Sequence, residues 1–275
     1  ARAVSITIFV ISFSLVLQLL VVSNLQQRAA QQRAYDRFRG ELATGTAPIG
    51  PTDAEGRQLA PGTPVAYLEV PSIGLRQVVV EGTKAGELFT GPGHRRDSPL
   101  PGQPGVSVVL GRRAAFGGPF ANLGKLEGGA LIHVVTGQGE FDYRVLGVRL
   151  EGEPVPAPVE AGGGRLLLAT AAGRSFMPDG VLRVDAELET PVVGGAAPLV
   201  STGTLPASEQ IMSVDTSTLW ALALWLQALI LVAVGAVWAW HRWGQARAWV
   251  VFLPPLIVVG LAASGEAARL LPNLL

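Results

Sequence analysis

The sequence contains no cysteine in 275 residues. This absence excludes disulfide bonds, thiolate-bound zinc and any reaction that uses a thiol nucleophile. It does not indicate a cellular compartment, because a cysteine-free chain is compatible with either side of a membrane. Charged residues are also scarce, at 15%, and 21 basic residues balance 21 acidic ones. A chain without net charge gives no indication of nucleic-acid binding.

Hydrophobic residues, by contrast, make up 49% of the chain, and the mean hydropathy is +0.38. We predict membrane-spanning helices at Val4–Asn24, Leu219–Trp240 and Trp249–Ser264, because such runs approach the ~20 residues that a span needs. No small-residue cleavage site follows the first run, so we expect an anchor rather than a signal peptide. Since the sequence begins with Ala1 rather than Met, we expect native residues before it. In an alternative with two spans, the last helix lies along the membrane interface.

The region between the first and second apolar runs has the pattern of a β-protein. Short runs such as VAYLEV, VSVVLG and RLLLATA are separated by Gly- and Pro-rich turns such as GPGH, PGQPG and MPDG. Many short strands with regular turns and almost no helical periodicity are typical of an antiparallel barrel or sandwich. About 130 residues are enough for one such hydrophobic core.

These patterns divide the chain into segments. We predict an N-terminal transmembrane helix with its extension at 1–42, a linker at 43–63, a β-barrel at 64–193, a second linker at 194–217, a transmembrane helix at 218–240, a short polar loop at 241–248, and a third transmembrane helix with the C-terminus at 249–275.

Several motifs, in order and spacing, resemble those of sortases, particularly the class E or actinobacterial type. The matching pieces are LEVPSIGLRQVVVEG (68–82), GPGH (91–94), LPGQPG (100–105), GRRAAFGGPFANLGKLEGG (111–129), FDYRVLGV (141–148), RLLLATAA (165–172) and VLRVDAEL (181–188). The resemblance implies a mainly β fold: a closed barrel, here with one N-terminal and two C-terminal transmembrane helices. It also implies a place outside the cytoplasmic membrane of a Gram-positive-type bacterium.

The reaction of that family uses a cysteine nucleophile, a histidine for proton transfer and an arginine that stabilises the oxyanion. By the resemblance, the cysteine position holds Ala171, the histidine position Arg112 and the arginine position Val181. Arg183 lies two residues beyond Val181 on the same strand face, and is an alternative, shifted arginine. Alanine has no reactive atom and arginine is not a base near neutral pH. The resemblance therefore implies a pseudo-sortase that is not an enzyme.

Other side chains near these positions leave two further functions open. Thr170 and Ser175 carry hydroxyls that could act as nucleophiles in a residual hydrolase, although no suitably placed histidine is evident. The second further function is that of a receptor, whose cleft binds an extended peptide or an anionic envelope ligand without a reaction. Its candidate binding residues are Arg112, Arg113, Arg174, Arg183 and His94. We expect neither a metal site nor a cofactor.

Three spans are more membrane sequence than one small domain needs as a tether. We therefore expect an accessory or assembly subunit that sits in the lipid bilayer with another integral membrane protein, such as a transporter or envelope-assembly complex. Arg242 and Arg247 favour a cytoplasmic loop and hence an external barrel, whereas four arginines after the first span favour the opposite orientation. We favour the external barrel because of the resemblance.

Overall fold

The computed structural model describes residue 9, residues 12–13, residues 18–53 and residues 55–275. The chain forms two compact units. The barrel unit comprises Leu25–Ser213 together with Pro272–Leu275, and the helical unit comprises Val214–Leu271 with the residues up to Asn24. Of the first predicted span, Val4–Asn24, residues 4–8, 10–11 and 14–17 lie outside the described residues.

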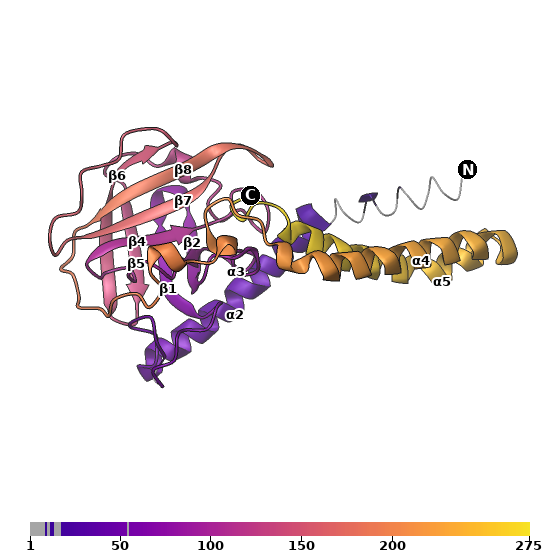
Figure 1. The fold of residues 1–275 in the computed structure, drawn as a ribbon, viewed down its shortest axis with the longest axis horizontal. Coiled ribbons are helices and arrows are strands. Elements are labelled where there is room, and N and C mark those ends of the chain that lie inside the picture. Colours follow the sequence, from indigo (N-terminus) through magenta and orange to yellow (C-terminus); the bar gives the residue numbers. More distant parts are fainter. Residues whose placement is uncertain (1–8, 10–11, 14–17, 54) are drawn as a thin grey trace. The chain divides into compact units, whose positions relative to one another are not determined.

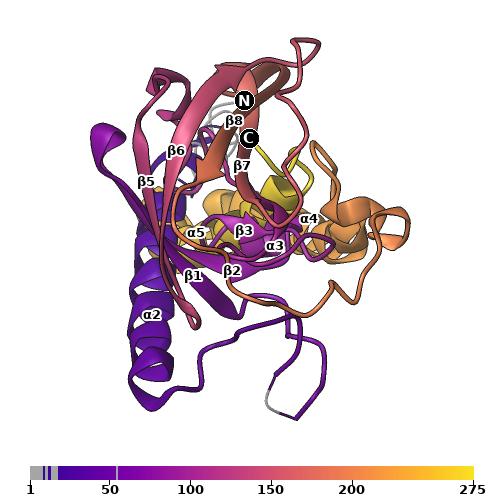
Figure 2. The same ribbon diagram turned by 90° about the vertical axis from the view of Figure 1, so that its left-hand side faces the viewer.

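The barrel unit contains a closed β-barrel in the strand order β1-β2-β3-β4-β7-β8-β6-β5 (Figures 1 and 2). The strands are β1 (Pro64–Val70), β2 (Leu75–Glu81), β3 (Gly93–His94), β4 (Gly105–Leu110), β5 (Leu131–Thr136), β6 (Gly139–Arg149), β7 (Gly164–Arg174) and β8 (Met177–Leu188). Most neighbours are antiparallel, but β2–β3 and β4–β7 are parallel. The predicted closed barrel is confirmed.

Two details of the barrel differ from the sequence pattern. The GPGH segment, expected as a turn, contains β3, whose two residues join β2 to β4. MPDG, also expected as a turn, belongs to β8, because Arg174 already pairs with Met177. The turn is Ser175–Phe176, with Phe176 in the left-handed region at φ 63°. This pair lacks the glycine or asparagine that marks such hairpins in a sequence, which explains why the pattern misplaced the turn.

The strands bury both of their faces where β4, β7 and β8 lie together. Leu166 and Leu168 of β7 belong to the main core of the barrel. The alternating residues Ala169 and Ala171 belong to a second apolar cluster, which also contains Val181 of β8. Because successive side chains of a strand point to opposite faces, the second cluster covers the outer face of this wall.

Helix α2 (Ser23–Thr44) ends near the expected Leu42 and packs beside β2 (Figure 2). The side-chain amide of Gln31 donates to the carbonyl of Val78 at 3.0 Å and accepts from its N–H at 2.7 Å. It also donates to the carbonyl of Thr90 at 2.8 Å. Since β3 pairs only with Val80 and Glu81, Gln31 takes the place of a strand partner at Val78.

The helical unit contains α4 (Leu219–Trp243) and α5 (Gln245–Arg269), which are the two helices of the described residues that are long and apolar enough to span a membrane. The predicted polar loop at 241–248 is wrong: only Gly244, at φ 89°, separates the helices. Glycine has no Cβ to oppose this conformation. Pro254 and Pro255 lie inside α5.

The remaining helices in the part of the chain that the structure describes are short. They are the π-helical η1 (Gln18–Val22), helix α3 (Ala85–Leu88), and the 3-10 turns η2 (Pro71–Ile73), η3 (Leu123–Lys125), η4 (Thr202–Thr204), η5 (Ala207–Glu209) and η6 (Thr216–Thr218). The predicted linker at 194–217 is partly docked, because Glu209 is 1% exposed and forms an ion pair with Arg96 of the barrel.

Candidate functional site

Three neighbouring strands, β4, β7 and β8, bring Arg112, Ala171 and Val181 to one site. Ala171 of β7 pairs directly with Val181 of β8. Arg112 follows the end of β4, whose Leu110 pairs with Ala169 of β7. The two sides are linked because Nη1 of Arg113 donates to the carbonyl of Ala171 at 3.2 Å. The strand topology therefore assembles the positions that the sequence motifs singled out.

The side chain of Arg112 is fully buried at this site. Its guanidinium carbon lies 4.6 Å from the ring centre of Phe89 and 5.4 Å from that of Phe116. Such faces attract a cation through their quadrupole. Nη1 donates to the carbonyl of Leu275 at 2.9 Å, while Nε and Nη2 have no hydrogen-bond partner among the described residues. Burial lowers the pKa of Arg112 to about 9. The guanidinium is therefore a charged group at neutral pH that has no Asp or Glu partner among the described residues.

The loop that carries Arg112 is held in a constrained shape. Phe116 is 3% exposed and has φ 51°, a conformation that costs free energy for a residue with a side chain. Its ring stacks on that of Phe89, with the centres 3.8 Å apart. These two aromatic partners could not be inferred from the sequence pattern, because they lie in different loops.

Ala171 is 0% exposed, so within the part of the chain that the structure describes its side chain does not line an open groove. Leu274 and Leu275 pack into the same apolar cluster as Ala171 and Val181. This result differs from the open cleft that a receptor for an external ligand would present. The covering residues were predicted as the end of a transmembrane segment, so sequence reasoning did not connect them with the site.

The two hydroxyl candidates occupy contrasting positions. Thr170 is 0% exposed, and its Oγ1 has no hydrogen-bond partner among the described residues. Ser175 is exposed in the turn between β7 and β8. None of the hydrogen bonds of the described residues joins either hydroxyl to a histidine: His94 and His133 bind acidic side chains instead. The base that would activate a hydroxyl is therefore missing from these contacts.

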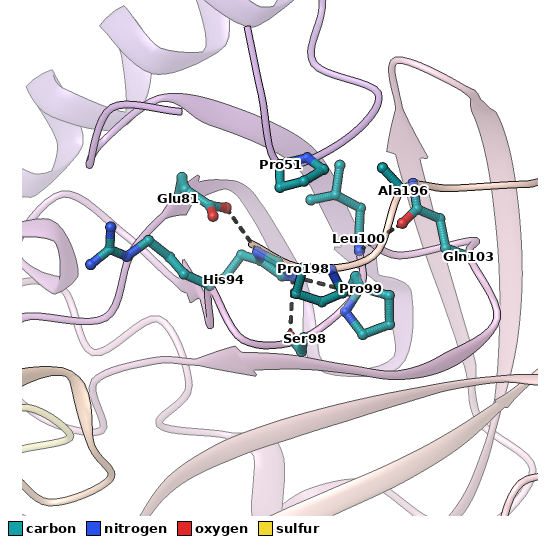
Figure 3. A pocket seen from close by; sticks show the side chains of 10 residues that line it. Pro51, Glu81, His94, Ser98, Pro99, Leu100, Gln103, Ala196 and Pro198 are labelled. Carbon is teal, nitrogen blue, oxygen red and sulfur yellow. Dashed lines mark hydrogen bonds and ion pairs between the residues drawn. The ribbon is translucent and has the colours of Figure 1, made fainter. Parts of the chain in front are cut away.

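His94, Glu81 and Ser98 have the outline of a catalytic triad elsewhere in the barrel unit (Figure 3). Nδ1 of His94 is 2.8 Å from Oε2 of Glu81, and Nε2 is 3.2 Å from Oγ of Ser98. However, Nε2 is also 3.0 Å from the carbonyl of Pro99, which can only accept a hydrogen bond. Nε2 must then carry a proton and cannot take one from Ser98.

The environment of this trio also indicates a structural role. Oγ of Ser98 already donates to the carbonyl of Arg95 at 2.7 Å and accepts from the N–H of Val108 at 3.1 Å. Burial alone would lower the pKa of His94, but the charge and hydrogen bond of Glu81 outweigh it and raise the pKa above its usual value. The adjoining cavity has a volume of about 10 Å³, roughly the space that one water needs.

The other arginine candidates do not gather in one place. Arg113 lies beside Ala171, and Arg183 is half-buried on β8, two residues from Val181. Arg174 is exposed at the end of β7. Within the described ranges, no three His, Asp or Glu side chains come close enough to hold a metal ion.

Comparison with known sequences identifies the domain. Residues 68–170 match the sequence model of the Sortase domain. The match ends before Ala171, so it does not cover that position or Val181. Sortase D of Bacillus subtilis (strain 168) is 34% identical over 89 residues, which are 32% of this chain and 43% of that protein. The chain thus spans less than half the length of this relative.

Solved sortase structures resemble the fold at lower similarity. A Clostridium perfringens Sortase D5 transpeptidase aligns with 59% of this chain and 99% of its own, at 18% identity and a TM-score of 0.49. Sortase E from Streptomyces avermitilis aligns with 48% of this chain and 91% of its own, at 27% identity and a TM-score of 0.40. Over residues 68–170, the barrel of this chain is therefore similar in sequence to a sortase domain.

Proposed function

We propose that this chain is a sortase-like membrane protein that does not catalyse transpeptidation and acts as an accessory or assembly subunit of a bacterial envelope complex. One observation supports the loss of catalysis above all. The positions assigned by resemblance to the nucleophile, the base and the oxyanion arginine meet at one site, where they hold Ala171, Arg112 and Val181.

The chemistry of these side chains supports the same proposal. The methyl group of Ala171 cannot attack a carbonyl. Arg112, with a pKa of about 9, stays protonated near neutral pH and cannot accept the proton of a nucleophile. Val181 offers no donor to a developing oxyanion. A residual hydrolase based on Thr170 would need a base that its described surroundings do not supply.

The helical unit supports the membrane part of the proposal. Helices α4 and α5 are long and apolar enough to span a membrane. Large apolar side chains on them are exposed, including Trp220 at 83%, Leu231 at 72% and Val250 at 78%. Surfaces of this kind require lipid or a protein partner. We propose the cytoplasmic membrane, with the barrel outside and a second integral membrane protein against the helices.

Two measurements on the full chain test this function. The first incubates the detergent-solubilised protein with a fluorogenic peptide that Bacillus subtilis sortase D cleaves in a parallel reaction. We expect no cleavage or transfer above the enzyme-free rate. Turnover that disappears in Thr170→Ala or Ser175→Ala would instead establish a residual hydrolase.

The second measurement is purification from native membranes in mild detergent, followed by mass spectrometry. We expect one membrane protein in stoichiometric amount. Recovery of the chain alone under every extraction condition would contradict a role as an accessory subunit. Co-purification with extracytoplasmic surface proteins would favour the alternative function, a receptor for an extended peptide, because Arg112 at the site already binds a peptide carbonyl.

A further inference from the structure

Residues Pro272–Leu275 follow α5 in the sequence but belong to the barrel unit. We refer to them as the return segment. They lie against the same apolar face as Ala171 and Val181, since Leu274 and Leu275 join that cluster at 0% and 4% exposure. A segment of four residues that is buried this completely requires specific contacts to hold its polar groups.

The side-chain and backbone N–H groups of Asn273 donate to three backbone carbonyls, whereas its side-chain oxygen Oδ1 has no hydrogen-bond partner among the described residues. Its side-chain amide donates to Thr83 at 3.0 Å and to Gln210 at 2.9 Å. Its backbone N–H donates to Ser213 at 2.9 Å. Asn273 itself is 0% exposed. Within the side-chain amide of asparagine, the NH₂ group donates hydrogen bonds and the oxygen only accepts them. Two carbonyl partners therefore identify the NH₂ group and fix the orientation of the amide.

The two leucines are bound through their carbonyls and their side chains. The carbonyl of Leu274 accepts from the N–H of Arg113 at 2.9 Å, and that of Leu275 accepts from Nη1 of Arg112 at 2.9 Å. Their side chains pack with Ala169 and Ala171. Alanine at these positions leaves room for leucine side chains that larger residues would fill.

The buried guanidinium of Arg112 depends on the return segment for its hydrogen bond. The guanidinium has one hydrogen bond to a described acceptor, and the return segment supplies that acceptor. Without the segment, Arg112 would keep the two aromatic faces but lose its hydrogen bond and its cover. The site is therefore complete only when the segment is in place.

We propose that the face formed by Arg112, Ala171 and Val181 is a peptide-docking site whose resident ligand is the return segment of the same chain. The donors at this face recognise two successive backbone carbonyls, its apolar floor accepts two leucine side chains, and the carbonyls of Thr83 and Gln210 select an asparagine amide. The docked segment closes the site to any other peptide. This inference does not depend on whether the chain is catalytic or on its membrane partner.

The absence of cysteine allows a direct test on the full chain in detergent micelles. The variant Leu274→Cys has a single cysteine, which a maleimide modifies only while the return segment is undocked. The labelling rate therefore measures how often the return segment leaves the barrel. Ser175→Cys, in an exposed turn, gives the rate for an open site. We expect Leu274→Cys to react at least about tenfold more slowly than Ser175→Cys.

Asn273→Asp then removes the two amide donors without changing the shape of the side chain. Added to Leu274→Cys, it places a carboxylate against two carbonyl oxygens, and we expect labelling to accelerate about tenfold or more. Asn122→Asp makes the same chemical change at an exposed position and serves as the matched control, with an expected change below about twofold.

Arg112→Ala tests the contact from the barrel side and should also accelerate labelling of Leu274→Cys. Hydrogen exchange in β1 and β5 checks that the barrel stays folded in each variant. Equal labelling rates for Leu274→Cys and Ser175→Cys would overturn the proposal. So would unchanged labelling in both Asn273→Asp and Arg112→Ala. If either Asn273→Asp or Arg112→Ala unfolds the barrel, the labelling rate of the other variant tests the proposal.

Discussion

His94 and Arg112, at 2% and 0% exposure, are basic residues that the barrel unit buries almost completely, and their polar groups are satisfied in opposite ways. His94 has hydrogen-bond partners at both ring nitrogens, with Glu81 on one side and the carbonyl of Pro99 on the other. Arg112 has one hydrogen bond, two aromatic faces and no acidic partner among the described residues. Burial therefore has different consequences at the two sites.

The difference lies in where the partners come from. The partners of His94 are close in sequence, 13 residues away for Glu81 and 5 for Pro99. Leu275, which accepts the hydrogen bond of Arg112, is 163 residues away. The first site is thus completed as soon as the barrel forms, whereas the second depends on a distant segment. The pair of His94 and Glu81 therefore stabilises the barrel itself. The site of Arg112 loses its hydrogen bond whenever the return segment leaves the barrel.

Breaking the pair at His94 should have the largest effect. Glu81→Ala leaves a buried imidazole without its carboxylate, and we expect a loss of about 3–5 kcal/mol in the free energy of unfolding of the barrel. Glu81→Gln keeps a hydrogen-bond acceptor and should cost less. Guanidinium unfolding followed by hydrogen exchange in β1–β8 measures both. Equal, small losses would show that the pair is not a stabilising contact.

Enlarging the floor of the other site should have an intermediate effect. Ala171→Leu adds three carbons where Leu274 and Leu275 pack, and overpacking of this kind costs about 1–3 kcal/mol. We expect the loss to appear as faster hydrogen exchange at residues 272–275 and at the end of β7. Ala114→Leu, on the half-buried loop, is the control. Unchanged exchange in Ala171→Leu would mean that the leucines do not fill this space.

The pH dependence of stability should distinguish the two sites further. Because the folded-state pKa of His94 is raised above its usual value, the folded barrel binds the proton more tightly than the unfolded chain. The resulting stability is fully present below about pH 6.5 and is lost as pH rises through the folded-state pKa, at no more than about 1.4 kcal/mol per pH unit. Unfolding midpoints between pH 5 and 9 measure this slope. His94→Gln should remove it, and a slope that survives the substitution would assign it to another group.

Replacing Arg112 should have the smallest effect on the barrel. Arg112→Met removes a buried charge that lacks an acidic partner and fills the space with apolar atoms. The substitution removes the cost of burying a charge but also removes one hydrogen bond, worth about 1 kcal/mol, and these two effects act in opposite directions. We therefore expect a net change of less than about 1 kcal/mol in the unfolding free energy of the barrel. The same denaturation experiment applies. A loss as large as that of Glu81→Ala would end the distinction between the two sites.

The sequence was sufficient to predict the barrel, because strand alternation and turn residues are local signals. The nearness of Arg112, Ala171 and Val181 was also predictable, since their positions followed from motifs whose strands are neighbours. The burial of Arg112 was not. Arginine is almost always exposed, and the residues that cover it lie in a segment whose composition indicated only a membrane helix. The two-residue strand β3 was also not predictable, because it is a strand through its pairing with β2 and β4 and not through its composition.

The contact of Gln31 with Val78 has a practical consequence. A β-strand with free N–H and C=O groups is a template for pairing with other molecules, and the amide of Gln31 occupies both groups of Val78. A soluble fragment that starts at the first strand, Pro64, would leave this edge open and tend to associate. A fragment intended for crystallisation should therefore begin within α2, before Gln31.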